Sequence, residues 1–147
     1  MARPREPVTA SHFRLTIGGH ESAGFFREVS GISSETDVTE ETATDQRGRS
    51  VVRRVPGANR YGNITLKRGV DTNTELWKWR KQVIDRGPDA ARVDGTIELL
   101  DAQGRPIATY RFLQGWPIKY VGPNLNAASN EIPIETIEIA HEGLERT

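Results

Sequence analysis

The chain has 147 residues, balances 20 basic against 20 acidic side chains, and contains no cysteine. A domain of this length removes about 70% of its unfolded surface from water, which is enough for one hydrophobic core. Zero net charge gives no general field toward nucleic acid or an anionic membrane. The lack of cysteine excludes disulfides, thiolate zinc sites and a cysteine nucleophile, and fits folding in a reducing cytoplasm. From the length we expect one domain over residues 1–147. Because neither a signal-peptide pattern nor a run of about 20 apolar residues occurs, we expect the protein to be made in the cytoplasm.

The first strand is expected at residues 12–17, after a polar segment, residues 1–11, that we interpret as a flexible arm. Apolar and polar residues alternate from Phe13 to Ile17, which is the period of a half-buried strand. A second strand over residues 25–29 is predicted to pair with the first as a hairpin.

Residues 33–60 form a long polar stretch with strand-forming residues but few apolar side chains. Its first half is acidic at Glu35, Asp37, Glu40, Glu41 and Asp45. Its second half is basic at Arg47, Arg49, Arg53, Arg54 and Arg60. The turn-formers Asp45 and Gly48 lie between the halves, so an extended hairpin is expected. Its arms would pair with each other, or with the arms of neighbouring copies, through opposite charges across strands.

Neither face of this hairpin is apolar enough to pack on the core of its own domain. Alternation places Glu35, Asp37, Thr39 and Glu41 on one face and Ser34, Thr36, Val38 and Glu40 on the other. The return arm is expected over residues 51–55 and to stop at Pro56-Gly57. A lone two-stranded ribbon is marginal in water and exposes unpaired edges. Although a solvated face is the usual interpretation of a charge run, we favour an assembly surface here.

A further strand is expected at residues 61–67, followed by the one strong helix of the chain. Thr72 and Glu75 form a predicted capping box, and Gly87-Pro88 supplies the stop. The apolar residues on one helix stripe are Leu76, Trp79 and Val83, with Trp77 and Ile84 beside it. We expect the tryptophans to be buried against a sheet.

The remainder of the chain predicts strands again. Strands at residues 96–100 and 107–113 flank a turn at residues 101–104, and a short strand follows at residues 116–121. In the last strand the apolar phase slips near Glu135-Thr136, where we predict a β-bulge. The fold class is therefore mainly β: a β-sandwich or partly closed barrel of short antiparallel strands, with one α-helix and a long protruding β-hairpin.

Motifs for catalysis or ligand binding are not found. The histidines, His12, His20 and His141, lack the spacing of a zinc site, and neither Ser22 nor Ser30 lies in a nucleophile elbow. The acidic run lacks the spacing of a calcium loop. The basic residues 47–60, with Lys67-Arg68 after them, could contact phosphates, but the acidic arm beside them would repel nucleic acid. We expect no catalytic residue, no metal and no cofactor.

Several stretches occur in one consistent order between residues 13 and 145. They are Phe26–Ile32, Pro56-Gly57 with Tyr61–Gly69, Leu76–Trp79, Gly115–Tyr120 with Gly122-Pro123, and Asn130–Leu144. Together they resemble the tail tube proteins of contractile phage tails and phage-tail-like contractile injection systems, whose fold is related to the haemolysin-coregulated protein of type VI secretion. The resemblance implies hexameric rings that stack into a hollow tube inside a contracting sheath.

The same resemblance implies roles for the hairpin. Residues 33–55 would join neighbouring strands in a barrel around the channel, and residues 42–50 would touch the adjacent ring. Candidates for lining the lumen are Glu35, Asp37, Thr39 and Glu41. Candidates for contacts between subunits or rings are Asp45, Arg47, Arg49, Arg53 and Arg54.

The implied partners are other copies of the chain, the sheath, baseplate and tube-terminating proteins, and a cargo protein or DNA in the lumen, with no membrane insertion of the subunit. The subunit would be made in the bacterial cytoplasm and become part of a virion tail or a phage-tail-like particle, and that particle could be released from the cell. Two other functions stay open: a baseplate adaptor or tube-initiating subunit of the same fold, and a β-barrel that carries a small ligand in an apolar cavity.

Overall fold

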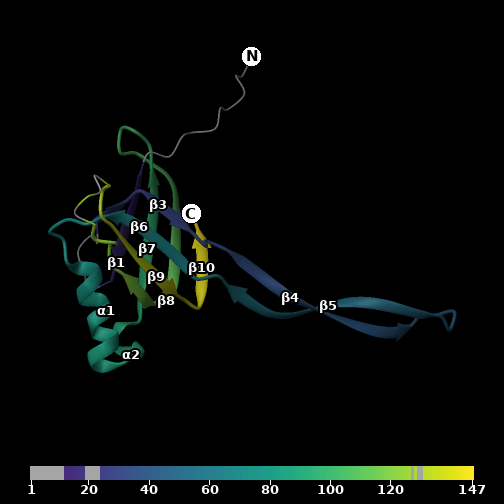
Figure 1. Ribbon diagram of the computed structural model, residues 1–147. Helices are drawn as coiled ribbons and strands as arrows, with labels where there is room; N and C mark the ends of the chain where they lie inside the picture. Colours follow the sequence, from purple (N-terminus) through teal and green to yellow (C-terminus); the bar gives the residue numbers. More distant parts are fainter. Residues whose placement is uncertain (1–11, 19–23, 127, 129–130) are drawn as a thin grey trace, which may run out of the picture.

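A computed structural model describes residues 12–18, 24–126, 128 and 131–147 (Figure 1). An antiparallel sheet of eight strands has the order β2-β1-β7-β8-β9-β6-β3, with β10 paired to β8. The strands are β1 (His12–Ile17), β2 (Gly24–Phe26), β3 (Glu28–Ser30), β6 (Ile64–Gly69), β7 (Val93–Leu100), β8 (Pro106–Val121), β9 (Ile134–Ala140) and β10 (Gly143–Arg146). The proposed arm at residues 1–11, His20 and Ser22 lie outside the described residues.

The long strand β8 bends, so it takes part in both layers of the sandwich. Its first part pairs with β7 and β10, and its last part, residues 116–121, pairs with β9. The bend lies at Gln114, which has φ 53°, and the Phe112 ring fills the space over Gly95 and Gly115, where a Cβ would come within 3 Å of it. The two strands expected at residues 107–113 and 116–121 are thus one bent strand.

The sheet is not closed, and its edge strands β2 and β3 follow one another in the chain with only Arg27 between them. The single strand expected at residues 25–29 is therefore divided in two. β2 pairs with β1, as the expected hairpin requires, whereas β3 pairs with β6.

Helix α1 (Glu75–Arg86) and a short second helix, α2 (Pro88–Ala91), cover the sheet. Trp79 is fully buried, and its indole N–H donates to the Ala91 carbonyl at 2.7 Å. Trp77, which was expected to be buried as well, is 45% exposed, and Ile84, beside the same stripe, is 58% exposed. The helix buries a narrow stripe, and the Trp77 ring lies at the border of that stripe, edge-on to the Tyr120 ring at a centroid distance of 5.3 Å.

The predicted capping box at the start of α1 is wrong. Helix α1 begins at Glu75, and Thr74, not Thr72, is the cap position. The Glu75 backbone N–H donates to Asn73 Oδ1 at 2.9 Å. An asparagine two residues before the helix therefore satisfies a donor that the capping box assigned to a threonine.

The predicted β-bulge at Glu135-Thr136 is also wrong. β9 pairs with β6 in continuous register from Ile134 to Ile139. Glu135 is 5% exposed and takes a core position in phase with Ile137 and Ile139, while Ile132 precedes the strand and is 66% exposed. The irregularity lies instead in β8, between Pro117 and Lys119. The apolar phase slips in the sequence because a carboxylate occupies a core site.

Strands β4 (Ser34–Thr44) and β5 (Ser50–Tyr61) form a separate two-stranded sheet, which we call the ribbon. It extends away from the sandwich, on the right in Figure 1, with α1 on the left. The expected fold class is confirmed: a mainly β sandwich with a protruding hairpin, to which the second helix is an addition.

Candidate assembly surface

The two strands of the ribbon bring opposite charges together. Cross-strand neighbours pair Glu35 with Arg60, Glu40 with Arg54 and Glu41 with Arg53. The acidic and basic arms of one chain therefore pair with each other, which was one of the two predicted arrangements. Pairs of this kind contribute about 0.2 to 1 kcal/mol each and set the register more than the stability.

An ion pair near the base of the ribbon connects Arg60 Nε to Asp37 at 2.7 Å. The hydrogen bond to Asp37 raises the pKa of the Arg60 guanidinium, so this side chain keeps its charge. Both side chains are partly exposed, so water screens their attraction.

The ribbon has two unlike faces. The charged face carries the four predicted lumen residues, Glu35, Asp37, Thr39 and Glu41, opposite Arg53, Val55 and Arg60. The opposite face carries Thr36, Val38, Glu40 and Thr42, opposite Val52, Arg54, Pro56 and Asn59. Val38 and Val52 are 52% and 66% exposed there. Arg53 and Arg54, which were predicted together as contact residues, thus lie on different faces.

A bulge in β5 keeps these faces aligned. The pairing shifts between Thr36–Asn59 and Val38–Pro56, so that Gly57 and Ala58 both face Asp37. A Cβ on Gly57 would lie 3.2 Å from the Asp37 Cβ. The return arm was expected to stop at Pro56-Gly57, but β5 continues to Tyr61 through this bulge. Proline and glycine mark a bulge as readily as a strand end.

Asp45 closes the tip of the ribbon. Its Oδ1 accepts the backbone N–H groups of Arg47 and Arg49 at 2.9 and 2.8 Å, and Gly48 has φ 77°. Asp45, a predicted contact residue, is therefore engaged in the turn itself. Arg47 and Arg49 are exposed at the tip.

Hydrogen bonds join the two ends of the ribbon at its root and connect that root to the sandwich. The Gly62 N–H donates to the Ser33 carbonyl at 3.4 Å, and Asn63 Nδ2 donates to Glu138 Oε1 at 3.0 Å. His141 Nε2 lies 3.0 Å from the Gly62 carbonyl. A crevice of about 620 Å³ opens beside this root. The sequence motifs gave His141 no role.

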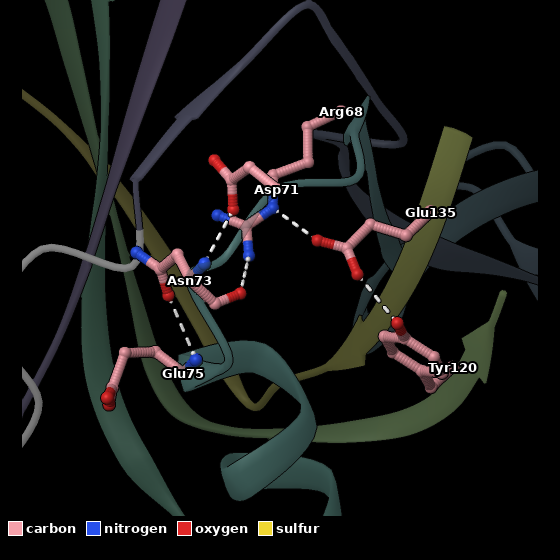
Figure 2. Close-up of polar contacts among 6 residues, drawn as sticks. All are labelled: Arg68, Asp71, Asn73, Glu75, Tyr120 and Glu135. Carbon is pink, nitrogen blue, oxygen red and sulfur yellow. Dashed lines mark hydrogen bonds and ion pairs between the residues drawn. The ribbon is translucent and has the colours of Figure 1, made fainter. Parts of the chain in front are cut away.

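A buried polar network fixes the sandwich on its helix side (Figure 2). Arg68 donates from Nε to Glu135 and from Nη2 to the Asn73 carbonyl at 3.1 Å. Tyr120 donates its hydroxyl to the other Glu135 oxygen at 2.6 Å. Burial raises the pKa of Tyr120 to about 12, and the hydrogen bond to Glu135 acts in the same direction. The network joins β6, β8 and β9 to the segment before α1.

This network was missed in the sequence, where Arg68 was grouped with residues that could contact phosphates. It is 3% exposed in the structure, so it does not belong to a basic surface. The available signal was the glutamate at a position where alternation called for an apolar residue. A buried carboxylate requires a partner, and the alternating arginine on a neighbouring strand supplies it.

The described residues contain no group of three or more His, Asp or Glu side chains that could hold a metal. In the part of the chain that the structure describes, neither helix has the length and apolar character needed to cross a membrane. A second crevice, of about 690 Å³, opens at the surface between β3, β6 and the segment before β9, and polar residues make up most of its lining. The described core is filled by aliphatic and aromatic side chains.

The described residues thus form a small antiparallel sandwich with a helix pair and a protruding two-stranded polar ribbon. The chain belongs to the family of T4-like virus tail tube protein gp19, whose model matches residues 9–145. None of the curated proteins compared with the chain matches it.

Solved structures show the same fold. A chain in the cryo-EM sheath–tube complex of the extracellular contractile injection system PVC, in its extended state, is 26% identical over 96% of this chain and 91% of its own, with a TM-score of 0.78. A chain in the cap of the anti-feeding prophage is 22% identical over 100% and 95%, with a TM-score of 0.80. Hcp1 from Flavobacterium johnsoniae is 20% identical over 92% and 94%, with a TM-score of 0.54.

The family establishes the chain as a tail tube protein, a structural component of phage-tail-like particles. The predicted resemblance to tail tube proteins, with a fold related to the haemolysin-coregulated protein, is thereby confirmed.

Proposed function

We propose that this tail tube protein forms hexameric rings that stack into a hollow conduit, and that the ribbon joins each subunit to its neighbours. The observation that carries the proposal is the isolation of the ribbon. Among the described residues, β4 and β5 pair only with each other, so both outer edges of the ribbon lack strand partners. A two-stranded ribbon of this length needs further strands or a packing surface to persist in water. Ribbons of adjacent subunits supply them.

The charged face of the ribbon lines the lumen in this arrangement. It holds five charged side chains at positions 35, 37, 41, 53 and 60, whereas the opposite face holds two, at positions 40 and 54. The opposite face exposes Val38 and Val52 beside Pro56, which favours burial against a neighbouring subunit. Glu35, Asp37, Thr39 and Glu41 then face the channel. A wet, mixed-charge wall suits a conduit that must release its cargo, whether protein or DNA.

The tip of the ribbon contacts the next ring. Arg47 and Arg49 project there from a turn that Asp45 holds rigid. Arg54, on the opposite face, is placed for a contact between subunits, whereas Arg53 faces the lumen beside Glu41. These two arginines consequently have separate roles in the assembled tube.

The partners outside the ring are a sheath, a baseplate and a tube-terminating protein. The PVC structure similar to this chain is a sheath–tube complex, and other similar chains occur in a tube-terminating cap and in a baseplate. We assign the subunit a structural, non-enzymatic function and assembly in the bacterial cytoplasm, in line with its lack of cysteine. The ligand-carrying barrel is disfavoured because the described core is filled with side chains.

The test is assembly of the full chain, followed by light scattering after size exclusion and by negative-stain electron microscopy. We expect rings or tubes for the wild type. A variant in which residues 36–58 are replaced by a short glycine turn should stay folded and monomeric, because the ribbon makes no strand pairs with the sandwich. A wild-type chain that stays monomeric at all concentrations would refute the proposal.

The contact at the tip is tested by the double charge reversal Arg47→Glu/Arg49→Glu. We expect shorter tubes or single rings, with ring diameter unchanged. The double variant Arg14→Glu/Glu98→Arg, which swaps an ion pair on the sandwich, serves as the matched control. Tubes of unaltered length in the tip variant would count against the stacking contact.

A further inference from the structure

His141, in the connection between β9 and β10, faces two backbone carbonyl groups at once. Its Nδ1 lies 2.8 Å from the Gly143 oxygen, and its Nε2 lies 3.0 Å from the Gly62 oxygen. A carbonyl oxygen can only accept a hydrogen bond, and a neutral imidazole carries a single N–H. A neutral ring would therefore set one nitrogen lone pair against a carbonyl lone pair. The imidazolium form donates in both contacts.

The two carbonyls belong to different parts of the molecule. Gly143 is the first residue of β10, in the sandwich. Gly62 follows β5, and its own N–H donates to the Ser33 carbonyl just before β4. Gly62 is held closely, since a Cβ there would lie 2.3 Å from Ser33 Oγ. His141 thus binds the peptide at which both strands of the ribbon meet the sandwich.

The charged groups around His141 come from both sides of the crevice. From the ribbon root, Glu35, Arg60 and Tyr61 line it, and the Tyr61 ring lies 5.6 Å from the imidazole centroid. Arg60 is paired with Asp37.

From the sandwich, Glu142 faces the same crevice and pairs with Arg92 at 2.8 Å. Glu138, on β9, accepts from Asn63. The Phe112 ring, on β8, lies 6.1 Å from the imidazole centroid and carries no charge. A positively charged His141 would therefore have Glu35 on the ribbon side and Glu142 on the sandwich side of the crevice. The arginine that lines the crevice, Arg60, is paired with Asp37.

We infer that His141 is a pH-sensitive clamp, doubly protonated when the ribbon is fixed to the sandwich, and that loss of one proton frees the ribbon root. Among side chains, histidine is the usual pH switch of proteins, because its ring can gain or lose a proton near neutral pH. The clamp itself depends only on contacts within one subunit. Its consequence for tube assembly rests on the proposed function.

The protonation state is read directly by nitrogen NMR of the histidine rings in the full ¹⁵N-labelled chain. At about pH 7 we expect two protonated ring nitrogens at His141, and His12, whose ring packs edge-on against the Phe25 ring, serves as the internal comparison. A single N–H tautomer at His141 at that pH would overturn the inference.

Hydrogen exchange then measures the root. In the wild type, amide protection of peptides covering residues 33–36 and 59–63, corrected for intrinsic rates, should fall about tenfold from about pH 6 to about pH 8.5. His141→Gln, which cannot titrate, should show no such dependence, and His12→Gln should behave as the wild type. Equal wild-type protection at both pH values, or a dependence that persists in His141→Gln, would refute the clamp.

Electron microscopy of the same samples separates the two proposals. A root that loosens with pH in a chain that never forms rings or tubes supports the clamp and refutes the proposed function. Tubes that form equally at both pH values from a chain with an insensitive root support the function and refute the clamp.

Discussion

The two longest hairpins of the molecule, β4–β5 and β7–β8, are closed by the same turn. In each, an aspartate is followed three residues later by glycine and four later by arginine: Asp45, Gly48 and Arg49 in the ribbon, and Asp101, Gly104 and Arg105 in the sandwich. The aspartate Oδ1 accepts the arginine N–H at 2.8 Å in both turns, and the glycines have φ 77° and 79°.

Their surroundings are opposite. β7 buries Gly95, Ile97 and Leu100 against the core, whereas every residue of β4 is exposed or half-buried. Turn chemistry and alternation therefore suffice to form a hairpin, but burial decides whether it is stable alone. The β7–β8 hairpin is stabilised within its own chain. In the proposed assembly, the ribbon would gain comparable stabilisation from other copies.

The largest effect is expected in the sandwich, at Trp79. Trp79→Ala removes a fully buried ring and its hydrogen bond to the Ala91 carbonyl, so the free energy of unfolding should fall by about 3 to 5 kcal/mol. Urea unfolding of the full chain measures it. The matched control is Trp77→Ala, on the same helix but 45% exposed, with an expected loss of about 1 kcal/mol or less. Equal losses would mean that the helix packs differently.

The buried ion pair comes next. Glu135→Leu removes the carboxylate that accepts from Nε of the 3%-exposed Arg68, and we expect a loss of about 3 kcal/mol in unfolding free energy. The double variant Arg68→Met/Glu135→Leu should recover part of that loss, because the buried arginine charge is then removed together with the carboxylate. The rest is not recovered, since the Asn73 carbonyl loses a donor. A double variant as unstable as the single one would show that shape, not charge, decides this site.

Ionisation of Tyr120 should lower the stability of the sandwich at high pH. Its pKa in the folded chain is about 12, above the ordinary 10, because burial and Glu135 disfavour the phenolate. The resulting stabilisation is complete below about pH 10 and is lost as the pH rises through about 12. Urea midpoints should therefore fall less steeply over this range in Tyr120→Phe than in the wild type. At about pH 8 the difference in urea midpoint between the two proteins should not change with pH. If that difference also stayed constant between about pH 10 and about 12, the raised pKa of Tyr120 would be refuted.

The same contrast explains what could be predicted from sequence. Strand alternation and turn residues are local, so β1, the hairpin at Asp101 and the ribbon were all expected. The errors arise where a distant partner overrides the local pattern. The apolar alternation of β9 is interrupted at Glu135, which was interpreted as a β-bulge. The carboxylate can occupy a core position because Arg68, on another strand, pairs with it. Asn73, not Thr72, supplies the acceptor for α1 because Arg68 binds its carbonyl and holds the segment. Which residues share a face of the ribbon depends on the bulge at Gly57. The Pro56-Gly57 pair was interpreted as the end of the strand, so the bulge was not predicted.

The two similar turns, at Gly48 in the ribbon and Gly104 in the sandwich, allow the same substitution to be compared in both hairpins. Its expected effect is the smallest of those considered. A Cβ added to Gly48 or Gly104 meets no atom within 4 Å, so Gly48→Ala and Gly104→Ala differ from wild type only by the strain of a positive φ. That strain costs about 1 kcal/mol at either site. Gly104→Ala should lower the free energy of unfolding of the subunit by this amount, because the β7–β8 hairpin unfolds with the core.

Gly48→Ala should leave the same measurement within about 0.5 kcal/mol of wild type, since a ribbon without partners can open locally before the sandwich unfolds. In assembled tubes the order should reverse, because the ribbon tip is then fixed between copies, and Gly48→Ala should raise the concentration needed for assembly about fivefold. Sedimentation of tubes at a series of concentrations measures that threshold. Equal effects of the two variants on subunit unfolding would mean that the ribbon is already part of the cooperative fold before assembly.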